Sequence, residues 1–282
     1  MRIFCLSDLH LEFYGGGGAF TEFWARFLKP KLAAVKKPEV LILAGDIGYP
    51  YPKESVHAQN YRQFLKNSRE IFPHVLVVPG NHEYYAGTNL NPTADSRAAI
   101  LKALRDLCRE TDVTLLQQNS ISIAGLRFLG TTLWSDIQRP AFKAMNDSKY
   151  VFDTVQEYQH AFRDDYTWLR NQLTEEGSGS SPTPTVIITH HLPTNRLIHP
   201  RFRDSYLNSG FATEILGPLS DEGLLGSVKY WFCGHSHERV KVDFGGLTLY
   251  LNPLGYPHEE KQRQTEPDFE TIFEIDGDTQ NP

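Results

Sequence analysis

The chain has 282 residues, of which 40% are hydrophobic and 12% aromatic, enough to bury a core in one large domain or two small ones. The formal net charge is −6 and no run of Lys or Arg stands out, which argues against a broad electrostatic footprint for nucleic acid. The three cysteines, Cys5, Cys108 and Cys233, show no CxxC spacing, a usage that fits a reducing compartment.

Export and membrane signals are not apparent in the sequence. A strand expected over residues 2–6 leaves no room for a signal peptide, and no apolar run is long enough to span a membrane. We therefore expect a cytoplasmic protein with no membrane partner. The sequence does not specify an oligomeric state.

Short apolar runs alternate with helix-forming stretches along the chain. The runs that predict buried strands cover residues 2–6, 40–44, 75–78, 186–189 and 230–233. The amphipathic stretches that predict helices cover residues 54–72, 93–110 and 153–175. Pairs of runs around Ala124-Gly125 and Gly245-Gly246 are typical of antiparallel hairpins. This pattern predicts an α/β fold with mixed sheets.

Two stretches rich in Gly or Ser predict loops. FYGGGGAF (13–20) is expected to form part of a mobile rim, and it lacks the Lys-Ser/Thr of a nucleotide P-loop. EEGSGSSPTPT (175–185) is expected to be a flexible surface loop, because strands and helices continue on both sides of it. We therefore expect one domain over residues 1–282, with segments near 134–165 and 192–211 covering the pocket.

The predicted strands end in side chains that can bind a metal ion. In chain order these side chains are Asp8 and His10, Asp46, Asn81 and His82, His190 and His191, and His235 and His237. Each group alone is explained as well by a cap, a turn or a core histidine. Five strand ends with the same chemistry are harder to explain in that way. In open α/β sheets the carboxyl edge is also where ligands bind.

The chemistry of these donors points to a pair of ions. Two carboxylates, one amide oxygen and four imidazoles, with no thiolate, suit Mn, Fe or Zn better than Ca or Mg. Seven donors are too many for one ion, whereas two ions that share a bridging carboxylate use them all. Such a pocket is positive, suits a phosphate, and lowers the pKa of a bridging water to make a hydroxide nucleophile.

The motifs at the strand ends, in their order, resemble those of the calcineurin-like metallophosphoesterase family. They are Asp8-x-His10, Gly45-Asp46, Gly80-Asn81-His82-Glu83, Thr189-His190 and Gly234-His235-Ser236-His237. They span residues 8–237, and the tail YLNPLGYPHEE with DFETIFEID is similar to the last strands of compact bacterial members. The resemblance implies a four-layer α/β/β/α sandwich of two mixed β-sheets.

The resemblance also implies a role for each motif residue. One divalent ion would take Asp8, His10, Asp46 and His237, and the other Asp46, Asn81, His190 and His235, with Asp46 as the bridge. The catalytic residues would be Asp46 and His82, the histidine near the leaving group, whose ring Glu83 or Asp46 would orient. His190 is chosen over His191 because it directly follows the strand.

The expected function is metal-dependent hydrolysis of a small phosphoester, by a phosphodiesterase or phosphomonoesterase with two divalent ions, Mn before Fe or Zn. Tyr84, Arg201 and Tyr206 are candidates for substrate contact, although packing or a solvated basic loop explains each of them as well. A nuclease of the same fold is disfavoured by the acidic balance and the lack of a basic track with aromatics. A non-catalytic metal-binding interaction module and protein phosphatase activity remain as alternatives.

Overall fold

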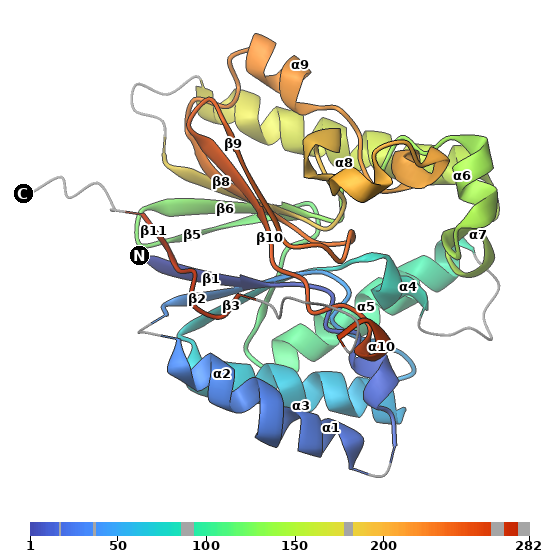
Figure 1. Cartoon of the computed structure of the whole chain (residues 1–282), viewed down its shortest axis with the longest axis vertical. Helices are drawn as coiled ribbons and strands as arrows, with labels where there is room; N and C mark the ends of the chain where they lie inside the picture. Colours follow the sequence, from blue (N-terminus) through green and yellow to red (C-terminus); the bar gives the residue numbers. More distant parts are fainter. Residues whose placement is uncertain (17, 36–37, 86–92, 178–182, 261–267, 276–282) are drawn as a thin grey trace, which may run out of the picture.

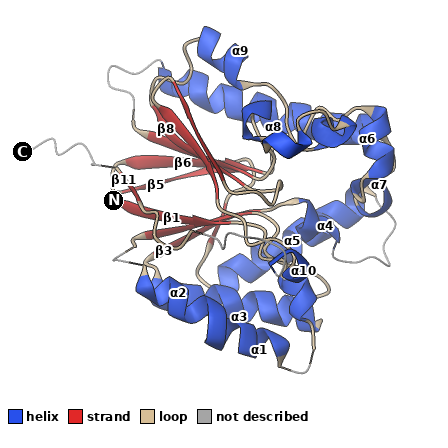
Figure 2. Ribbon diagram, in the orientation of Figure 1, coloured by secondary structure: helices blue, strands red, loops and turns tan. Residues whose placement is uncertain are grey.

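The computed structural model describes the chain except for residues 17, 36–37, 86–92, 178–182, 261–267 and 276–282. Two β-sheets lie face to face at its centre, and helices cover the outer face of each sheet (Figure 1). The strand order is β11-β1-β2-β3-β4 in the first sheet and β5-β6-β7-β8-β10-β9 in the second. The expected four-layer α/β/β/α sandwich of two mixed sheets is confirmed (Figure 2).

The first sheet is parallel except at one edge. Its strands are β1 (Arg2–Leu6), β2 (Val40–Ala44), β3 (His74–Val78), β4 (Thr114–Leu115) and β11 (Phe273–Glu274). β1 to β4 run parallel, in a register that pairs Phe4 with Leu41 and Leu41 with Val75, and β11 is antiparallel to β1. The loops after β1, β2 and β3 therefore leave the sheet at the same edge.

The second sheet is parallel at its centre and antiparallel at both edges. Its strands are β5 (Asn119–Ile123), β6 (Leu126–Thr131), β7 (Thr185–Thr189), β8 (Val228–Cys233), β9 (Val240–Phe244) and β10 (Leu247–Leu251). β6, β7, β8 and β10 run parallel, and the β5–β6 and β9–β10 hairpins close the edges. The turn residues Ala124-Gly125 and Gly245-Gly246 all have positive φ, as a two-residue hairpin turn requires.

The longer helices flank the sheets, and short helices lie at the edge where the parallel strands end (Figure 1). Beside the first sheet lie α1 (Ala19–Phe23), the π-helical turn η2 (Trp24–Leu28), α2 (Lys29–Ala34), α3 (Val56–Ile71) and α5 (Ala94–Glu110). Beside the second lie α8 (Val155–Gly177) and α9 (Leu216–Asp221), whereas α6 (Arg139–Ala144) lies at the edge where the parallel strands end. The short helices are η1 (Leu11–Tyr14), α4 (Asn81–Tyr85), α7 (Asp147–Tyr150), η3 (Asn195–Leu197), η4 (Pro200–Phe202), η5 (Tyr206–Gly210) and α10 (Pro257–Glu260).

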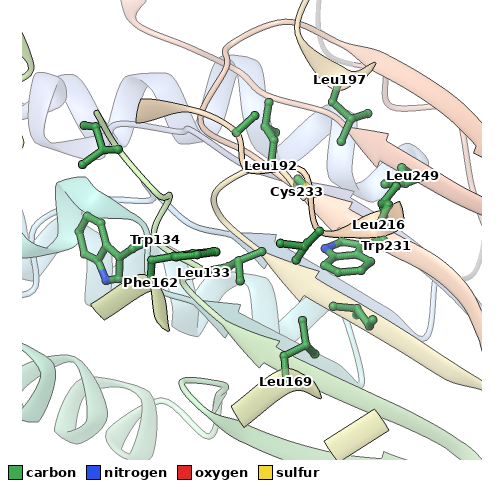
Figure 3. Packing of buried hydrophobic residues seen from close by; sticks show 14 of the residues in the cluster. Leu133, Trp134, Phe162, Leu169, Leu192, Leu197, Leu216, Trp231, Cys233 and Leu249 are labelled. Carbon is green, nitrogen blue, oxygen red and sulfur yellow. The ribbon is translucent and has the colours of Figure 1, made fainter. Parts of the chain in front are cut away.

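Three hydrophobic clusters hold the four layers together. Because side chains alternate along a strand, Ile3 joins the cluster between the sheets while Phe4 joins the cluster under α1 to α3. In the second sheet Phe232 points to the other sheet, whereas Trp231 packs toward α8 with Leu169 (Figure 3). Strands that are buried on both faces are thus fixed in register. The loops at their carboxyl ends start from rigid positions.

The strands and helices expected from the hydrophobic pattern are confirmed, with small differences at their ends. The glycine-rich stretch 13–20 is only partly a loop, because it includes the end of η1 and the start of α1. The helical turns between Ala19 and Ala34 were not predicted. Their buried residues Phe20, Phe23 and Trp24 nonetheless follow the helical period. Within the expected loop 175–185, α8 continues to Gly177, and residues 178–182 lie outside the described part of the chain.

The structure bears on only some of the other expectations about organisation. Among the described residues, no helix has the length and apolar character needed to cross a membrane. Cys5, Cys108 and Cys233 are buried free thiols. The cytoplasmic location, the missing signal peptide and the single domain with two covering segments stay predictions.

Candidate metal centre

The strand ends of both sheets meet at one place. Backbone hydrogen bonds join the loop after β1 to the loop after β2, from Asp8 N–H to the Gly45 carbonyl (2.9 Å) and from His10 N–H to the Asp46 carbonyl (3.0 Å). Another joins the loops after β8 and β7, from Gly234 N–H to the His190 carbonyl (3.0 Å). The predicted donors therefore converge from five different strands.

Five of these residues have a backbone conformation that non-glycine residues rarely adopt. Asp8, His10, Asp46, His235 and His237 have φ between 48° and 71°. The left-handed region is unfavourable for L-residues, although Asp and His tolerate it better than most. The backbone of His235-x-His237 is therefore not extended, and its two side chains do not share a face through strand alternation. Strained residues that cluster at one place are typical of functional sites.

A first group of donors consists of Asp8, His10, Asp46 and His237, whose candidate ligand atoms lie within 4.8 Å of one another. His10 Nε2 is 3.0 Å from His237 Nε2 and 3.9 Å from Asp46 Oδ2. His237 Nε2 is 3.5 Å from Asp8 Oδ1. Three of the four side chains are buried, and His237 keeps 13% exposure.

A second group shares Asp46 with the first and adds His190, His235 and Asn81. His190 Nε2 is 3.4 Å from Asp46 Oδ1, 3.2 Å from His235 Nδ1 and 3.0 Å from Asn81 Oδ1. Asp46 thus contributes one oxygen to each group. The structure brings all seven predicted ligands together, divided between two groups as the resemblance implies.

The hydrogen-bond partners of the four imidazoles leave lone pairs facing each other. Nδ1 of His10 lies 2.9 Å from Glu12 Oε1 and Nδ1 of His237 lies 2.8 Å from Glu259 Oε2. An ionised carboxylate only accepts hydrogen bonds, so each Nδ1 carries a hydrogen. In neutral rings the two Nε2 atoms, 3.0 Å apart, would then both be acceptors. Such a pair needs a cation between the nitrogens.

The second group repeats this arrangement with carbonyl partners. His190 Nδ1 lies 2.9 Å from the Ala44 carbonyl, and His235 Nε2 lies 3.3 Å from the Gly210 carbonyl. A carbonyl oxygen only accepts hydrogen bonds, so His190 Nδ1 and His235 Nε2 must both donate. The other nitrogen of each ring, which faces the other imidazole, therefore presents a lone pair. Without an ion, a proton supplies the charge. Although burial opposes it, the carboxylates of Asp46 and Asp8 raise the pKa of His190 to about 9.

Two glycines are required by the closeness of these loops. A Cβ on Gly80 would clash with the Asp46 carboxylate and would lie 2.6 Å from the Asp46 backbone nitrogen. A Cβ on Gly45 would clash with the His190 ring, and Gly45 also has φ of +87°. Both positions lack room for any side chain. They therefore have a steric role beyond that of an ordinary turn residue.

Glu83 holds the loop that carries Asp46. Its carboxylate accepts hydrogen bonds from the backbone N–H groups of Asp46 (3.0 Å), Ile47 (2.8 Å) and Gly80 (2.6 Å), and from the Tyr61 hydroxyl (3.3 Å). The expectation that Glu83 orients the His82 ring is wrong, because both oxygens of its carboxylate are taken up by these donors. Its contribution is to fix the backbone after β2 beside the start of α4.

His82 lies beside the two groups, is buried, and has another partner. Its Nδ1 is 2.9 Å from Glu12 Oε1, the same oxygen that contacts His10, and its Nε2 is 3.2 Å from the Tyr256 hydroxyl. Asp46 Oδ1 accepts the backbone N–H of His82 (2.8 Å) and does not hold its ring. Because α4 is a helix, the side chains of Asn81 and His82 diverge, so His82 is in neither group, and its ligand atom instead lies within 4.8 Å of those of His10 and Glu12.

Charge at the site is set by burial and by these contacts. Although burial opposes it, hydrogen bonds from His10 and His82 lower the pKa of Glu12 to about 2, so this carboxyl is ionised. Although burial opposes it, Asp46 and Glu12 raise the pKa of His82 to about 9. The imidazoles of His190 and His82 likewise hold the pKa of Asp46 well below its usual range, despite its burial. The site as a whole favours bound positive charge.

Both segments expected to cover the pocket reach the ligand groups. Asp147, in α7, accepts hydrogen bonds from Asn81 Nδ2 (3.1 Å) and from the Tyr85 hydroxyl (2.9 Å). These contacts turn the amide so that Asn81 Oδ1 faces His190. The 192–211 segment contributes the Gly210 carbonyl that faces His235.

The three residues considered for substrate contact lie elsewhere or are engaged. Tyr84 is buried, with its ring against Trp134 (5.6 Å between centroids), so it is a core residue. Arg201 pairs with Glu238, and Tyr206 is 66% exposed. The structure does not bring any of them to the ligand groups. His191 donates to or accepts from the Tyr158 hydroxyl (3.1 Å) and packs on His235, which is a supporting position.

Sequence reasoning missed several polar residues that the structure brings to this edge, namely Glu12, Asp147, Tyr256 and Glu259. Glu12 carried a usable signal, since it follows Asp8 and His10 at the same spacing of two in DLHLE. The other three lie far along the chain from their partners. Only the tertiary structure assigns them to the site.

Comparison with known proteins agrees with this architecture. The family model "Calcineurin-like phosphoesterase" matches residues 1–239. The chain is 27% identical over 278 residues to the uncharacterized protein L509 of Acanthamoeba polyphaga mimivirus, covering 90% of this chain and 91% of that protein. It also superposes on the crystal structure of the phosphopantetheinyl hydrolase of Mycobacterium tuberculosis with a TM-score of 0.64. In that pair 18% of residues are identical, and 100% of this chain and 98% of the other are covered. The chain belongs to the calcineurin-like phosphoesterase family.

Proposed function

We propose that this chain hydrolyses a small phosphoester with two divalent ions that share Asp46. The family supports metal-dependent phosphoester hydrolysis. The observation that carries the two-ion proposal is the arrangement of four imidazoles in two facing pairs. In each pair the outer nitrogens donate to oxygen atoms and the inner nitrogens lie 3.0 or 3.2 Å apart. Each pair is thereby prepared for its own cation.

The donor chemistry fits a pair of first-row transition metals. One ion would be held by Asp8, His10, Asp46 and His237, and the other by Asp46, Asn81, His190 and His235. Imidazole and carboxylate donors without a thiolate suit Mn, Fe and Zn, and we expect Mn to support activity. When bound, the two ions would neutralise phosphate charge and acidify a water molecule.

The residues of the chain have separate tasks in this reaction. Glu12 and Glu259 fix the ring orientations of His10 and His237. His82 lies outside both groups; Glu12 faces its Nδ1, and its Nε2 would give a proton to the departing oxygen. Asn81 is a neutral donor, so the second ion keeps more of its charge than a third carboxylate would leave it.

The proposed substrate class is broad. A small phosphodiester or phosphomonoester fits a site where His237 and Tyr256 are partly exposed while His82 and His235 are buried beside them. The phosphopantetheinyl hydrolase that shares the fold acts, by its name, on a phosphopantetheinyl group. A phosphopantetheinyl ester therefore belongs in the substrate panel beside simpler esters.

The test combines metal content with turnover. Protein treated with chelator should lose activity on an aryl phosphoester, and Mn²⁺ should restore it as two metals per chain bind. The panel would contain an aryl phosphate, an aryl phosphodiester, cyclic nucleotides, a phosphopantetheinyl ester and single-stranded DNA. Saturation at one metal per chain would contradict the shared carboxylate. Preferential cleavage of DNA would favour the nuclease, and no turnover with any metal would favour the interaction module.

A further inference from the structure

Tyr256 lies directly over the first ligand group. Its ring centroid is 4.3 Å from that of His10 and 4.6 Å from that of His237, and its hydroxyl is 3.2 Å from His82 Nε2. The side chain is only partly buried, so one side of it is open to solvent. Tyr256 also lies beyond residues 1–239, the part of the chain that the family model matches.

The backbone around Tyr256 is tied to the site. Leu254 N–H donates to the Ser7 carbonyl (3.0 Å), and Gly255 N–H donates to the Asp8 carbonyl (2.8 Å). The backbone N–H of Tyr256 donates to Glu259 Oε2 (2.9 Å), the oxygen that also faces His237. These contacts extend the pairing of β1 past its end. The hydroxyl therefore occupies a fixed position beside His82.

The hydrogen bonds of His82 decide to which group the Tyr256 hydroxyl can donate. Glu12 takes the hydrogen on Nδ1 of His82, so only Nε2 can face a substrate. The atom that Nε2 meets is the Tyr256 oxygen. When Nε2 carries a hydrogen it donates to that oxygen, and the phenol hydrogen is then left for a third group. Because His82 is buried and Tyr256 is only partly buried, a departing oxygen that approaches from solvent meets Tyr256 before the ring of His82.

We infer that Tyr256 is a catalytic residue that passes a proton from His82 to the leaving oxygen. As the bond from phosphorus to the leaving oxygen breaks, that oxygen keeps the electron pair and takes the phenol hydrogen. Tyr256 takes the hydrogen of His82 Nε2 in the same step, so Tyr256 is unchanged and His82 becomes neutral. The attacking water oxygen forms the new bond to phosphorus and loses one of its protons to solvent, from which His82 regains a proton before the next turnover. The inference rests on the proposed hydrolysis and on His82 as the proton source.

The central experiment compares Tyr256→Phe with the parent chain on two esters of the same phosphate. One ester has an alkyl or nucleoside leaving group, which needs a proton, and the other has nitrophenolate, which leaves as an anion. A general acid contributes about 10²–10⁴-fold, so we expect a loss of that order for the alkyl ester and a small one for the nitrophenyl ester. Tyr230→Phe is the matched control, because its hydroxyl donates to the Glu274 carbonyl, away from the ligand groups.

Two further measurements separate this role from a structural one. Metal content and the thermal midpoint of Tyr256→Phe should match the parent chain, because the ring packing is kept. In protein with ¹⁵N-labelled histidine and no metal, the ring resonance of His82 should shift in Tyr256→Phe and stay unchanged in Tyr230→Phe. An unshifted resonance, or equal losses on both esters, would overturn the inference.

Variants of His82 distinguish failure of the inference from failure of the proposed function. His82→Ala should show the same selective loss on the alkyl ester, and adding Tyr256→Phe should cost little more, because the proton source is already gone. If His82→Ala is selective and Tyr256→Phe is not, the inference falls and the proposed hydrolysis stands. If neither variant loses more activity on the alkyl ester while chelation still abolishes turnover, the role of His82 as the general acid is wrong as well. If chelation has no effect, the proposed function itself is wrong.

Discussion

Glu259 Oε2 lies 2.8 Å from Nδ1 of His237, so a carboxylate from the last helix supports a ring from the loop after β8. Glu12 has the same relationship to His10. The two histidines of the second group instead donate to the carbonyls of Ala44 and Gly210. A carboxylate partner makes an imidazole a more basic ligand than a carbonyl does. We therefore expect the first ion to bind more tightly than the second.

Replacing Glu259 with Gln tests this difference. Loss of such a partner typically weakens metal binding by about 10–100-fold, and we expect this in one of two binding steps when Mn²⁺ is titrated by calorimetry. The step assigned to the second ion should change little. Glu222→Gln is the control, since Glu222 pairs with Arg170 on the surface. Equal weakening of both steps would show that Glu259 acts on the whole site.

Asp46 and His10 should differ in how many ions they affect. Asp46→Asn removes the carboxylate that contributes an oxygen to both groups, so both ions should be lost in part. His10→Ala removes a donor from the first group alone. Elemental analysis after dialysis against Mn²⁺ gives the ratio of metal to chain for each variant. A loss confined to one ion in Asp46→Asn would contradict the bridge.

Gly80→Ala tests the steric argument without removing any ligand. The added methyl group would meet the Asp46 carboxylate and the His190 ring, so we expect loss of metal and of turnover. Gly217→Ala is the matched control, because a Cβ there meets nothing within 4 Å. Metal content near that of the parent chain in Gly80→Ala would mean that the two loops can move apart.

Asp165 should make stability depend on pH. It is buried in α8, accepts hydrogen bonds from Thr131 Oγ1 (2.6 Å) and Gln118 Nε2 (2.9 Å), and burial raises its pKa to about 6. The folded state therefore binds a proton more tightly than the unfolded state. Stability from this group is present at acid pH and falls as pH rises through about 4 to 6, by at most about 3 kcal/mol.

Asp165→Asn removes the titration and is the measurement for this effect. The free energy of unfolding is measured for both proteins by urea titration without metal. Relative to Asp165→Asn, the parent chain should lose stability as pH rises from about 4 to 6. Above that window the difference should level off. A difference that does not vary with pH would mean that the carboxyl is charged throughout.

Much of the fold and the seven candidate ligands could be predicted because their signals are local. Apolar runs mark strands such as Val40–Ala44, and the polar residue that follows each run is adjacent in sequence. Parallel strands bring their carboxyl ends to one edge of a sheet, so Asp8 and Asp46 meet at the edge of the first sheet, and His190 and His235 at the edge of the second. The sequence by itself thus determined most of the strands and helices and the donor set.

The partners that complete the site were decided by tertiary structure alone. Glu12 meets His82 across 70 residues of sequence, and Tyr256 meets His82 across 174. Neither contact has a sequence period, because each depends on how two loops from different strands pack. The left-handed backbone at His235 and His237 likewise depends on the surrounding fold, because L-residues disfavour that conformation on their own. Local patterns report which face of an element is buried, whereas the neighbours of a loop side chain are set by the packing of the whole fold.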